Sequence, residues 1–221
     1  MLDEMRNWPK KNDRDGIQHP GSRIQNPAVY GFSLIELMIV MALIIVMYYL
    51  MFSPASRPYQ IRQMAACQKQ LQQVYVSLKI YAQENGGRFP AVEGAATSEA
   101  PLSLLIPRYT TVTEIFICPG SGDRQLPAAE PFAEKRISYA YYMGRTDKDA
   151  SQALVSDRQV STLAKSAGEK VFSTDGRKPG NNHRQYGGVL LFCDGRVEGS
   201  PPLGTHDLPI PENVILLNPK P

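Results

Sequence analysis

One carboxylate, that of Glu36, lies inside the most apolar segment of the chain. Residues 32–52 read FSLIELMIVMALIIVMYYLMF, in which 19 of 21 residues are apolar. An acidic side chain costs ~2.5 to 3.5 kcal/mol at the centre of a membrane-spanning helix and less near the interface, so its presence points to a function. Two interpretations stay open. Glu36 either serves a function within the apolar segment, or it lies at a membrane surface and reaches back to the lipid headgroups.

A second candidate site combines His183 with two aspartates, Asp175 and Asp194. Histidine and carboxylate side chains near one flexible loop could form a catalytic centre or bind a metal ion. Each aspartate, however, directly precedes a glycine at the end of a predicted strand, which is typical of a turn. A histidine in the Asn- and Gly-rich loop 176–187 is more often exposed than catalytic. The sequence therefore favours turns over an active site here.

The overall composition excludes several classes of protein. The 221 residues include 24 Lys and Arg against 21 Asp and Glu, a net charge of +3, and 43% are hydrophobic. This balance argues against collagen, extensive disorder and a highly basic nucleic-acid-binding protein. The three cysteines, Cys67, Cys118 and Cys193, include no CxxC spacing and no pairing with histidine. We therefore expect that they do not form a zinc framework.

The N-terminal part of the chain divides into three segments. Residues 1–31 are polar, rich in Pro and Asn, and lack any helical apolar repeat, which predicts an unfolded leader. As a helix, residues 32–52 would extend ~31 Å, the hydrocarbon thickness of a bilayer, so we expect a transmembrane helix. Residues 53–87 carry apolar side chains at three- and four-residue steps, which predicts an amphipathic helix ending at Asn85-Gly86-Gly87. Pro54 and Pro58 predict a kink or a short break between the two helical halves.

Residues 88–221 read as short strands separated by turns. The segment 188–193, GVLLFC, is apolar on both faces, so we expect it between neighbouring strands and the apolar stripe of the amphipathic helix. The Asp194-Gly195 pair predicts a hairpin after it. The predicted fold class is α+β, with a long N-terminal helix packed on a small antiparallel β-sheet. The predicted strands are 113–118, 137–143, 171–174, 188–193, 196–198 and 213–217, with a short apolar turn or helix at 102–106 and a short helix at 161–167.

The string GFSLIELM at residues 31–38 closely resembles the cleavage and methylation signature of type IV prepilins and of the pseudopilins of type II secretion systems. Farther along, FICPGSGD, ISYAYYM and HRQYGGVLLFCDGRVEG look like the C-terminal half of prepilin-type proteins. The globular part resembles the major pseudopilin most. The resemblance implies a pilin-like fold, cleavage after Gly31 and N-methylation of the new terminal residue, Phe32.

The resemblance also implies a location and a set of partners. Residues 1–31 would be a cytoplasmic leader, 32–52 a single span of the bacterial inner membrane, and 88–221 a periplasmic domain joined through 53–87. The implied partners are a prepilin peptidase, further copies of the chain in a helical filament, an inner-membrane assembly platform, minor pilins and the lipid bilayer. No specific nucleic acid is expected.

Cleavage would free an α-ammonium group on Phe32, one helical turn from Glu36. The carboxylate of Glu36 on a neighbouring subunit could neutralise this ammonium as the helices bundle in the filament. An unpaired charge in such a bundle would be strongly disfavoured. The pair would therefore favour one axial register between subunits.

The resemblance bears on disulfides and metals as well. Cysteines on the outward face of a membrane can oxidise, and Cys118 and Cys193 each end a predicted strand, so they are the favoured pair for a disulfide. Some major pseudopilins bind calcium in their C-terminal loops, which makes Asp175 and Asp194 candidate ligands. No run of alternating acidic residues supports calcium, so no cofactor or metal is expected.

The expected function is structural and not enzymatic. The chain would be a subunit of a type II secretion pseudopilus, a filament that drives protein export. One alternative is a subunit of a type IV pilus used for adhesion, motility or DNA uptake. Another, from a different class, is a membrane-tethered periplasmic hydrolase that uses His183 and Asp194.

Overall fold

The computed structural model describes residues 33–52 and 56–221. The predicted leader, the cleavage position at Gly31 and the methylated Phe32 lie outside the described residues. The chain divides into two compact units, Met1–Ser53 and Pro54–Pro221, which we describe separately.

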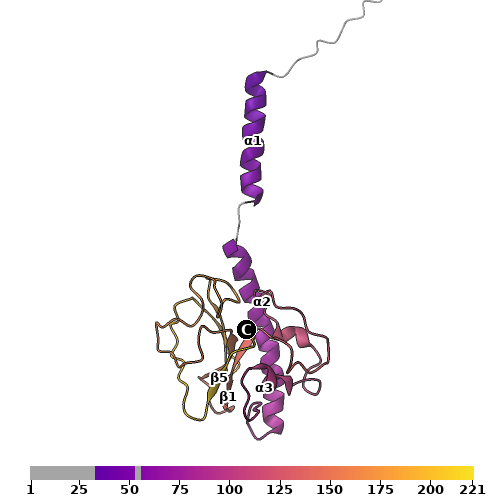
Figure 1. The fold of residues 1–221 in the computed structure, drawn as a ribbon, viewed down its shortest axis with the longest axis vertical. Helices are drawn as coiled ribbons and strands as arrows, with labels where there is room; N and C mark the ends of the chain where they lie inside the picture. The colour runs from indigo at the N-terminus through magenta and orange to yellow at the C-terminus, as the bar shows by residue number, and fades with distance from the viewer. Residues whose placement is uncertain (1–32, 53–55) are drawn as a thin grey trace, which may run out of the picture. The chain divides into compact units, whose positions relative to one another are not determined.

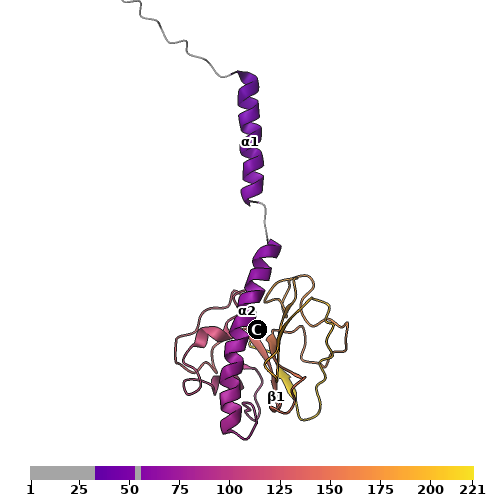
Figure 2. The same cartoon turned by 180° about the vertical axis from the view of Figure 1, so that it is seen from behind.

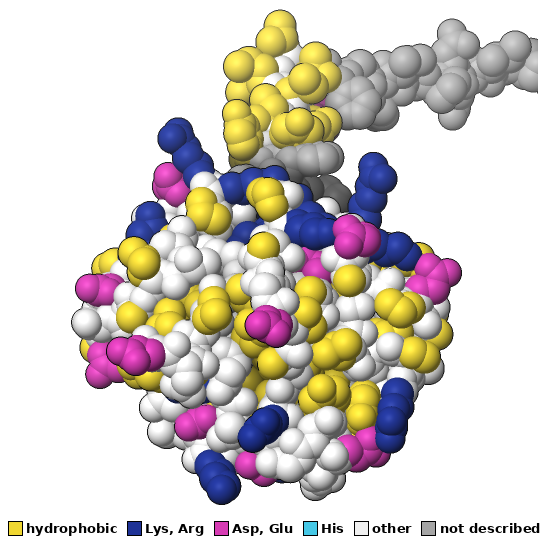
Figure 3. Space-filling view, turned by 60° about the horizontal axis from the view of Figure 1, so that its bottom comes forward, with side chains coloured by type: hydrophobic (Ala, Val, Ile, Leu, Met, Phe, Trp, Pro, Cys, Tyr) yellow, Lys and Arg dark blue, Asp and Glu magenta, His cyan; other side chains and the backbone are white. Residues whose placement is uncertain are grey.

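Helix α1 (Leu34–Phe52) is the described part of the first unit. Its large apolar side chains, from Leu34 to Tyr49, have exposed fractions of 41% to 76%, so each of them presents much of its surface to the outside of the helix. Hydrophobic side chains accordingly dominate its surface in the space-filling view (Figure 3). Within residues 33–52 and 56–221, no helix combines the length and the apolar character that crossing a membrane requires. This finding differs from the transmembrane helix that the sequence predicts over 32–52.

Helix α2 (Ser56–Glu84) opens the second unit and supplies one wall of its core. Its fully buried face consists of Cys67, Leu71, Val74, Leu78 and Ala82, at the three- and four-residue steps that predict an amphipathic helix. The helix ends where the sequence predicts. The N–H of Gly87 bonds the carbonyl of Ala82, and Gly86 and Gly87 have positive φ angles of 65° and 83°.

A five-stranded antiparallel sheet forms the centre of the second unit, in the order β4-β3-β2-β1-β5. Strand β3 is buried along its whole length and lies between β2 and β4, which confirms the environment expected for GVLLFC. The Asp194-Gly195 turn connects β3 to β4, and Gly195 has the positive φ of 90° that favours glycine. The strands are β1 (Tyr139–Met143), β2 (Ala153–Asp157), β3 (Gly188–Phe192), β4 (Val197–Ser200) and β5 (Ile215–Leu217).

The two faces of the sheet are covered by different parts of the chain. Helix α2 packs on one face together with the segment that carries α3 (Glu99–Ser103) and the 3₁₀ helix η1 (Thr113–Phe116). The later segments, with Phe172, Leu208 and Val214, cover the other face. Figures 1 and 2 show the two coverings on opposite sides of the sheet. The second unit is thus α+β, as predicted.

Three local predictions are wrong and one strand was not predicted. Residues 113–118 begin as η1 and not as a strand, because the Ile117 N–H bonds back to the Glu114 carbonyl. Residues 161–167 form no helix and 171–174 form no strand; Lys165 and Lys170 each make an isolated bridge instead. The missed strand is β2, whose sequence ALVSD ends in an aspartate, a residue that is depleted in strands.

Candidate functional site

Four side chains with metal-binding or catalytic chemistry meet in the core of the second unit. Cys67 comes from the buried face of α2, Cys118 follows η1, Asp157 ends β2, and His183 belongs to the loop before β3. Their exposed fractions are 0% or 1%. We call these four residues the buried cluster. The fold alone brings them together, since they are separated by 26 to 116 positions along the sequence.

The potential ligand atoms of the buried cluster lie within 4.8 Å of one another. His183 Nε2 is 3.3 Å from Asp157 Oδ2 and 3.3 Å from Cys118 Sγ. Cys67 Sγ is 3.6 Å from Asp157 Oδ1 and 3.9 Å from Asp157 Oδ2. Asp157 and His183 therefore form the centre of the cluster, with one sulfur close to each of them.

Neighbouring groups hold the Asp157 carboxylate in place. The Asn182 side chain donates a hydrogen bond of 2.7 Å to Oδ1, and the Val189 N–H donates one of 2.8 Å to Oδ2. Asn182 is itself fixed by a second bond, to the carbonyl of Ser138. The two donors come from the loop and from β3, so the carboxylate joins these two parts of the core, and Asn182 links them to the segment before β1 through the Ser138 carbonyl.

Without a metal, Asp157 and His183 form a buried ion pair. Burial opposes ionisation of Asp157, but the charge of His183 and the hydrogen bonds from Asn182 and Val189 outweigh it, so the pKa of the carboxyl lies below its usual value. Burial also opposes protonation of His183, yet the charge of Asp157 and the bond between them raise its pKa to about 10. The imidazole is then a cation at neutral pH.

The two cysteines of the cluster are protonated in the metal-free protein. Burial raises the pKa of Cys67 and raises that of Cys118 well above its ordinary value. The Tyr139 hydroxyl lies 3.3 Å from Cys67 Sγ and 3.1 Å from Gln70 Oε1, to which it donates. Neither thiol is therefore an activated nucleophile in this state.

Gly120 allows the imidazole to fit against the loop that follows Cys118. A Cβ at this position would lie 2.5 Å from His183 Nδ1 and 2.6 Å from the Asn182 carbonyl oxygen. Any larger residue would push the histidine away from the cluster. The chain turns here, because the Ser121 N–H bonds the Cys118 carbonyl.

The structure separates the residues that the sequence groups around His183. Asp175 Oδ1 accepts hydrogen bonds from Ser173 and from the Arg177 N–H, and Asp194 Oδ1 accepts one from the Arg196 N–H. Both aspartates thus lie in turns, and neither belongs to the buried cluster. The expectation that Asp175 and Asp194 bind no calcium stays a prediction.

The expectation that His183 is exposed is wrong, since the side chain is fully buried against Asp157. Asp157 and Cys67 were missed. Cys67 could have been found from the helical repeat, because it lies four residues before Leu71 on the same face of α2. Asp157 had only a weak signal, an acid at the end of an apolar segment.

The predicted disulfide between Cys118 and Cys193 is not present, because Cys67, Cys118 and Cys193 are all free. Cys118 belongs to the buried cluster. Val189, in β3, lies beside the same cluster, because its N–H bonds Asp157. Cys193 lies four residues beyond Val189, just after the end of β3, which places it ~13 Å from Val189 at 3.3 Å per residue. A disulfide requires Cα atoms within about 7 Å, so strand ends alone were a poor guide to pairing.

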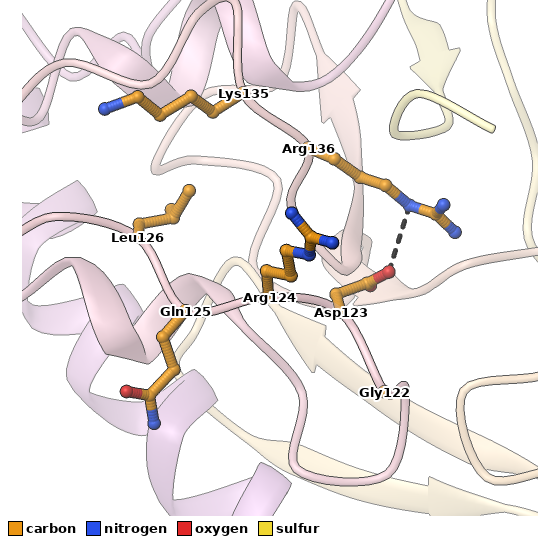
Figure 4. Close-up of a pocket in the computed structure, with 7 residues that line it drawn as sticks. All are labelled: Gly122, Asp123, Arg124, Gln125, Leu126, Lys135 and Arg136. Atoms are coloured by element: carbon orange, nitrogen blue, oxygen red, sulfur yellow. Dashed lines mark ion pairs between the residues drawn. The ribbon is translucent and has the colours of Figure 1, made fainter.

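A separate surface cavity of about 510 Å³ is lined by residues 122–126 together with Lys135 and Arg136. Figure 4 shows Asp123 directed toward Arg136, with an Nε–Oδ1 distance of 3.0 Å. Lys135 pairs with Glu130 at 2.8 Å. The lining contains no histidine, cysteine or serine, and two of its cations already have carboxylate partners. This cavity therefore offers little chemistry compared with the buried cluster.

The N-terminal motif is described only from Ser33 onward. Glu36 lies in the first turn of α1, where its side chain is exposed.

A comparison with protein families bears directly on this segment. Residues 27–47 match the prokaryotic N-terminal methylation motif. The methylation motif contains Gly31, Phe32 and Glu36, so it supports a type IV pilin-like protein. Neither the curated proteins nor the solved structures that were compared give a match.

Proposed function

We propose that the chain is a filament subunit that is made as a precursor, cleaved between Gly31 and Phe32 by a prepilin peptidase, N-methylated and assembled with other copies of itself. The observation that carries the proposal is the methylation motif at residues 27–47, which includes the first part of α1, residues 34–47. Its role would be structural and not enzymatic. The complete burial of His183 supports this view, because a hydrolytic centre needs contact with its substrate.

The surface of α1 supports assembly through this helix. Its large side chains are apolar and exposed around the whole circumference, and a helix of this kind requires a lipid or protein environment. In the proposed cycle the N-terminal segment anchors the chain at the bacterial inner membrane before assembly, and the same helices of neighbouring subunits cover α1 afterwards. The second unit would then lie in the periplasm and form the outside of the filament.

Glu36 would provide the register of assembly. The new N-terminus on Phe32 carries a positive charge, and Glu36 is the first acidic residue after it. Among packed apolar helices, a carboxylate and an ammonium attract strongly and are each disfavoured alone. Contact between the Glu36 carboxylate of one subunit and the N-terminus of the next would therefore fix their axial offset.

We prefer a type II secretion pseudopilus over a type IV pilus as the filament. The resemblance of the globular part to the major pseudopilin supports this choice. In that setting the partners are an inner-membrane assembly platform and minor pilins, and the filament drives protein export. A surface pilus for adhesion, motility or DNA uptake is the alternative, and filament length in cells would distinguish the two.

Substitution of the glycine at the cleavage position tests the proposal. In cells that contain a prepilin peptidase, the wild-type chain should lose residues 1–31, whereas Gly31→Ala should accumulate at the size of the precursor. Ala28→Ser, three residues away, serves as the matched control and should be processed normally. Equal electrophoretic mobility of wild type, Gly31→Ala and a wild-type sample from peptidase-deficient cells would overturn the proposal.

A further inference from the structure

We propose that Cys67, Cys118, Asp157 and His183 together bind one Zn²⁺ ion in the core of the second unit. This inference goes beyond filament formation and does not depend on it. It rests on the position, chemistry and surroundings of the four side chains.

The spacing of the ligand atoms suits a tetrahedral zinc ion. Zn²⁺ binds nitrogen and oxygen at about 2.0 to 2.2 Å and sulfur at about 2.3 Å, so tetrahedral ligands lie about 3.3 to 3.8 Å apart. His183 Nε2 is 3.3 Å from both Asp157 Oδ2 and Cys118 Sγ. Cys67 Sγ is 3.6 Å from Asp157 Oδ1. With Asp157 Oδ2 as the ligand oxygen, Cys67 Sγ lies 3.9 Å from it, and all four ligand atoms lie within 4.8 Å of one another, so small side-chain movements would complete a tetrahedral site.

The ligand types favour zinc over other cations. Two cysteine sulfurs, one imidazole nitrogen and one carboxylate oxygen form a mixed sulfur, nitrogen and oxygen set, whereas calcium and magnesium prefer oxygen alone. Four protein ligands leave no open position for a substrate or water. Because all four are buried, the ion would have a structural role.

Groups around the ligands hold them in the required orientation. Asn182 and the Val189 N–H fix the two oxygens of Asp157, and the Tyr139 hydroxyl lies beside Cys67 Sγ. Hydrogen-bonding neighbours of this kind orient metal ligands and typically change metal affinity ~10- to 100-fold. Gly120 leaves the room that His183 needs to direct Nε2 toward the other three ligands.

A route to the site is present on the surface. A cavity of about 250 Å³ is lined by Cys118 together with Gln70 and Glu114, among other residues. It approaches the cluster from the side where α2 faces η1. The cavity therefore brings solvent close to one cysteine of the cluster.

Zinc would join elements that are far apart in the sequence. The ligands come from α2, from the segment after η1, from the end of β2 and from the loop before β3. Unfolding would break all four bonds, so zinc binding would be coupled to the stability of the second unit.

Zinc content of the purified full-length chain tests the site. The protein is purified under reducing conditions, stripped of metal with a chelator, and returned to buffer with equimolar ZnCl₂ before gel filtration and elemental analysis. We expect one zinc per chain for wild type and a loss of stoichiometric binding for Cys67→Ser and Cys118→Ser. Cys193→Ser is the matched control, because Cys193 is also buried and free but lies outside the cluster, and it should retain one zinc.

Cobalt provides a second readout on the wild-type chain, which avoids variants that fail to fold. Co²⁺ added to the stripped protein should give the strong visible absorption of a tetrahedral site and a sulfur-to-metal charge-transfer band, and ZnCl₂ should remove both. Asn182→Ala should weaken cobalt binding ~10- to 100-fold. A folded wild-type chain that binds neither metal, full zinc binding by Cys118→Ser, or a Cys67–Cys118 disulfide in the native protein would each overturn the proposal.

Discussion

Replacing Asp157 by asparagine tests the buried ion pair of the metal-free protein. The carboxylate accepts hydrogen bonds from Asn182 and Val189 and faces the His183 cation, whereas an amide offers one oxygen and no charge. Removing one partner of a buried pair costs about 3 to 5 kcal/mol. A single donor left without an acceptor accounts for about 1 to 3 kcal/mol of that cost. We therefore expect Asp157→Asn to lower the free energy of unfolding by about 3 to 5 kcal/mol.

Urea unfolding of the stripped full-length chain, followed by circular dichroism, measures this loss. If the free energy of unfolding falls by about 2 kcal/mol per M of urea, the unfolding midpoint should fall by about 1.5 to 2.5 M. Asp194→Asn is the matched control, because Asp194 lies in a partly exposed turn, and its midpoint should change little. A midpoint for Asp157→Asn as high as that of Asp194→Asn would refute the buried pair.

Three further predictions concern the pair, the core and the filament. In metal-free protein the pKa of His183 is raised to about 10, so the contribution of its charge to the free energy of unfolding is complete below about pH 6.5. This contribution should decline as the pH rises, by at most about 1.4 kcal/mol per pH unit. Urea midpoints that stay constant between about pH 6.5 and 9 would contradict this prediction. Leu78→Ala should cost about 2 to 5 kcal/mol because Leu78 is fully buried in the face of α2, whereas Ile80→Ala on the exposed side of the same helix should cost much less; equal urea midpoints would show that this face is not part of the core. Glu36→Ala should be processed like wild type but form few filaments in electron micrographs, and normal filaments from this variant would exclude the charge pair.

Helix α2 and the β3–β4 hairpin could be predicted because local patterns determine them. The helical repeat from Leu71 to Ala82 and the glycines at 86–87 fix the buried face and the end of the helix. The Asp194-Gly195 pair fixes the turn, and the apolar segment 188–192 fixes the central strand. These signals depend on neighbours in the sequence, so no knowledge of the tertiary structure is needed to read them.

The buried cluster could not be predicted for the opposite reason. Cys67, Cys118, Asp157 and His183 have no spacing in common, and only the packing of α2, β2 and two loops brings them together. The sequence instead suggested His183 together with the aspartates of the two Asp-Gly turns. In the structure each of these carboxylates accepts a hydrogen bond from the backbone N–H two residues later in its own turn. Aspartate occurs both in exposed turns and in buried ion pairs, and only the burial of the side chain in the folded protein distinguishes the two roles.

The wrong disulfide has a related cause. Cys118 and Cys193 each follow an apolar segment, but one of these segments is the 3₁₀ helix η1 and the other is a strand that carries Cys193 away from the cluster. The position of a cysteine at the end of a helix or strand does not show which other cysteine lies beside it in the fold. The partner of Cys118 in space is Cys67, from a helix whose buried face the sequence did define.

The N-terminus of the native protein tests the central claim most directly. Intact mass spectrometry with N-terminal fragmentation, on protein from cells that contain a prepilin peptidase, identifies the first residue and its modification. A filament subunit of the proposed kind begins at N-methylated Phe32. A native protein that begins at Met1, with residues 1–31 still attached, would contradict the proposed function.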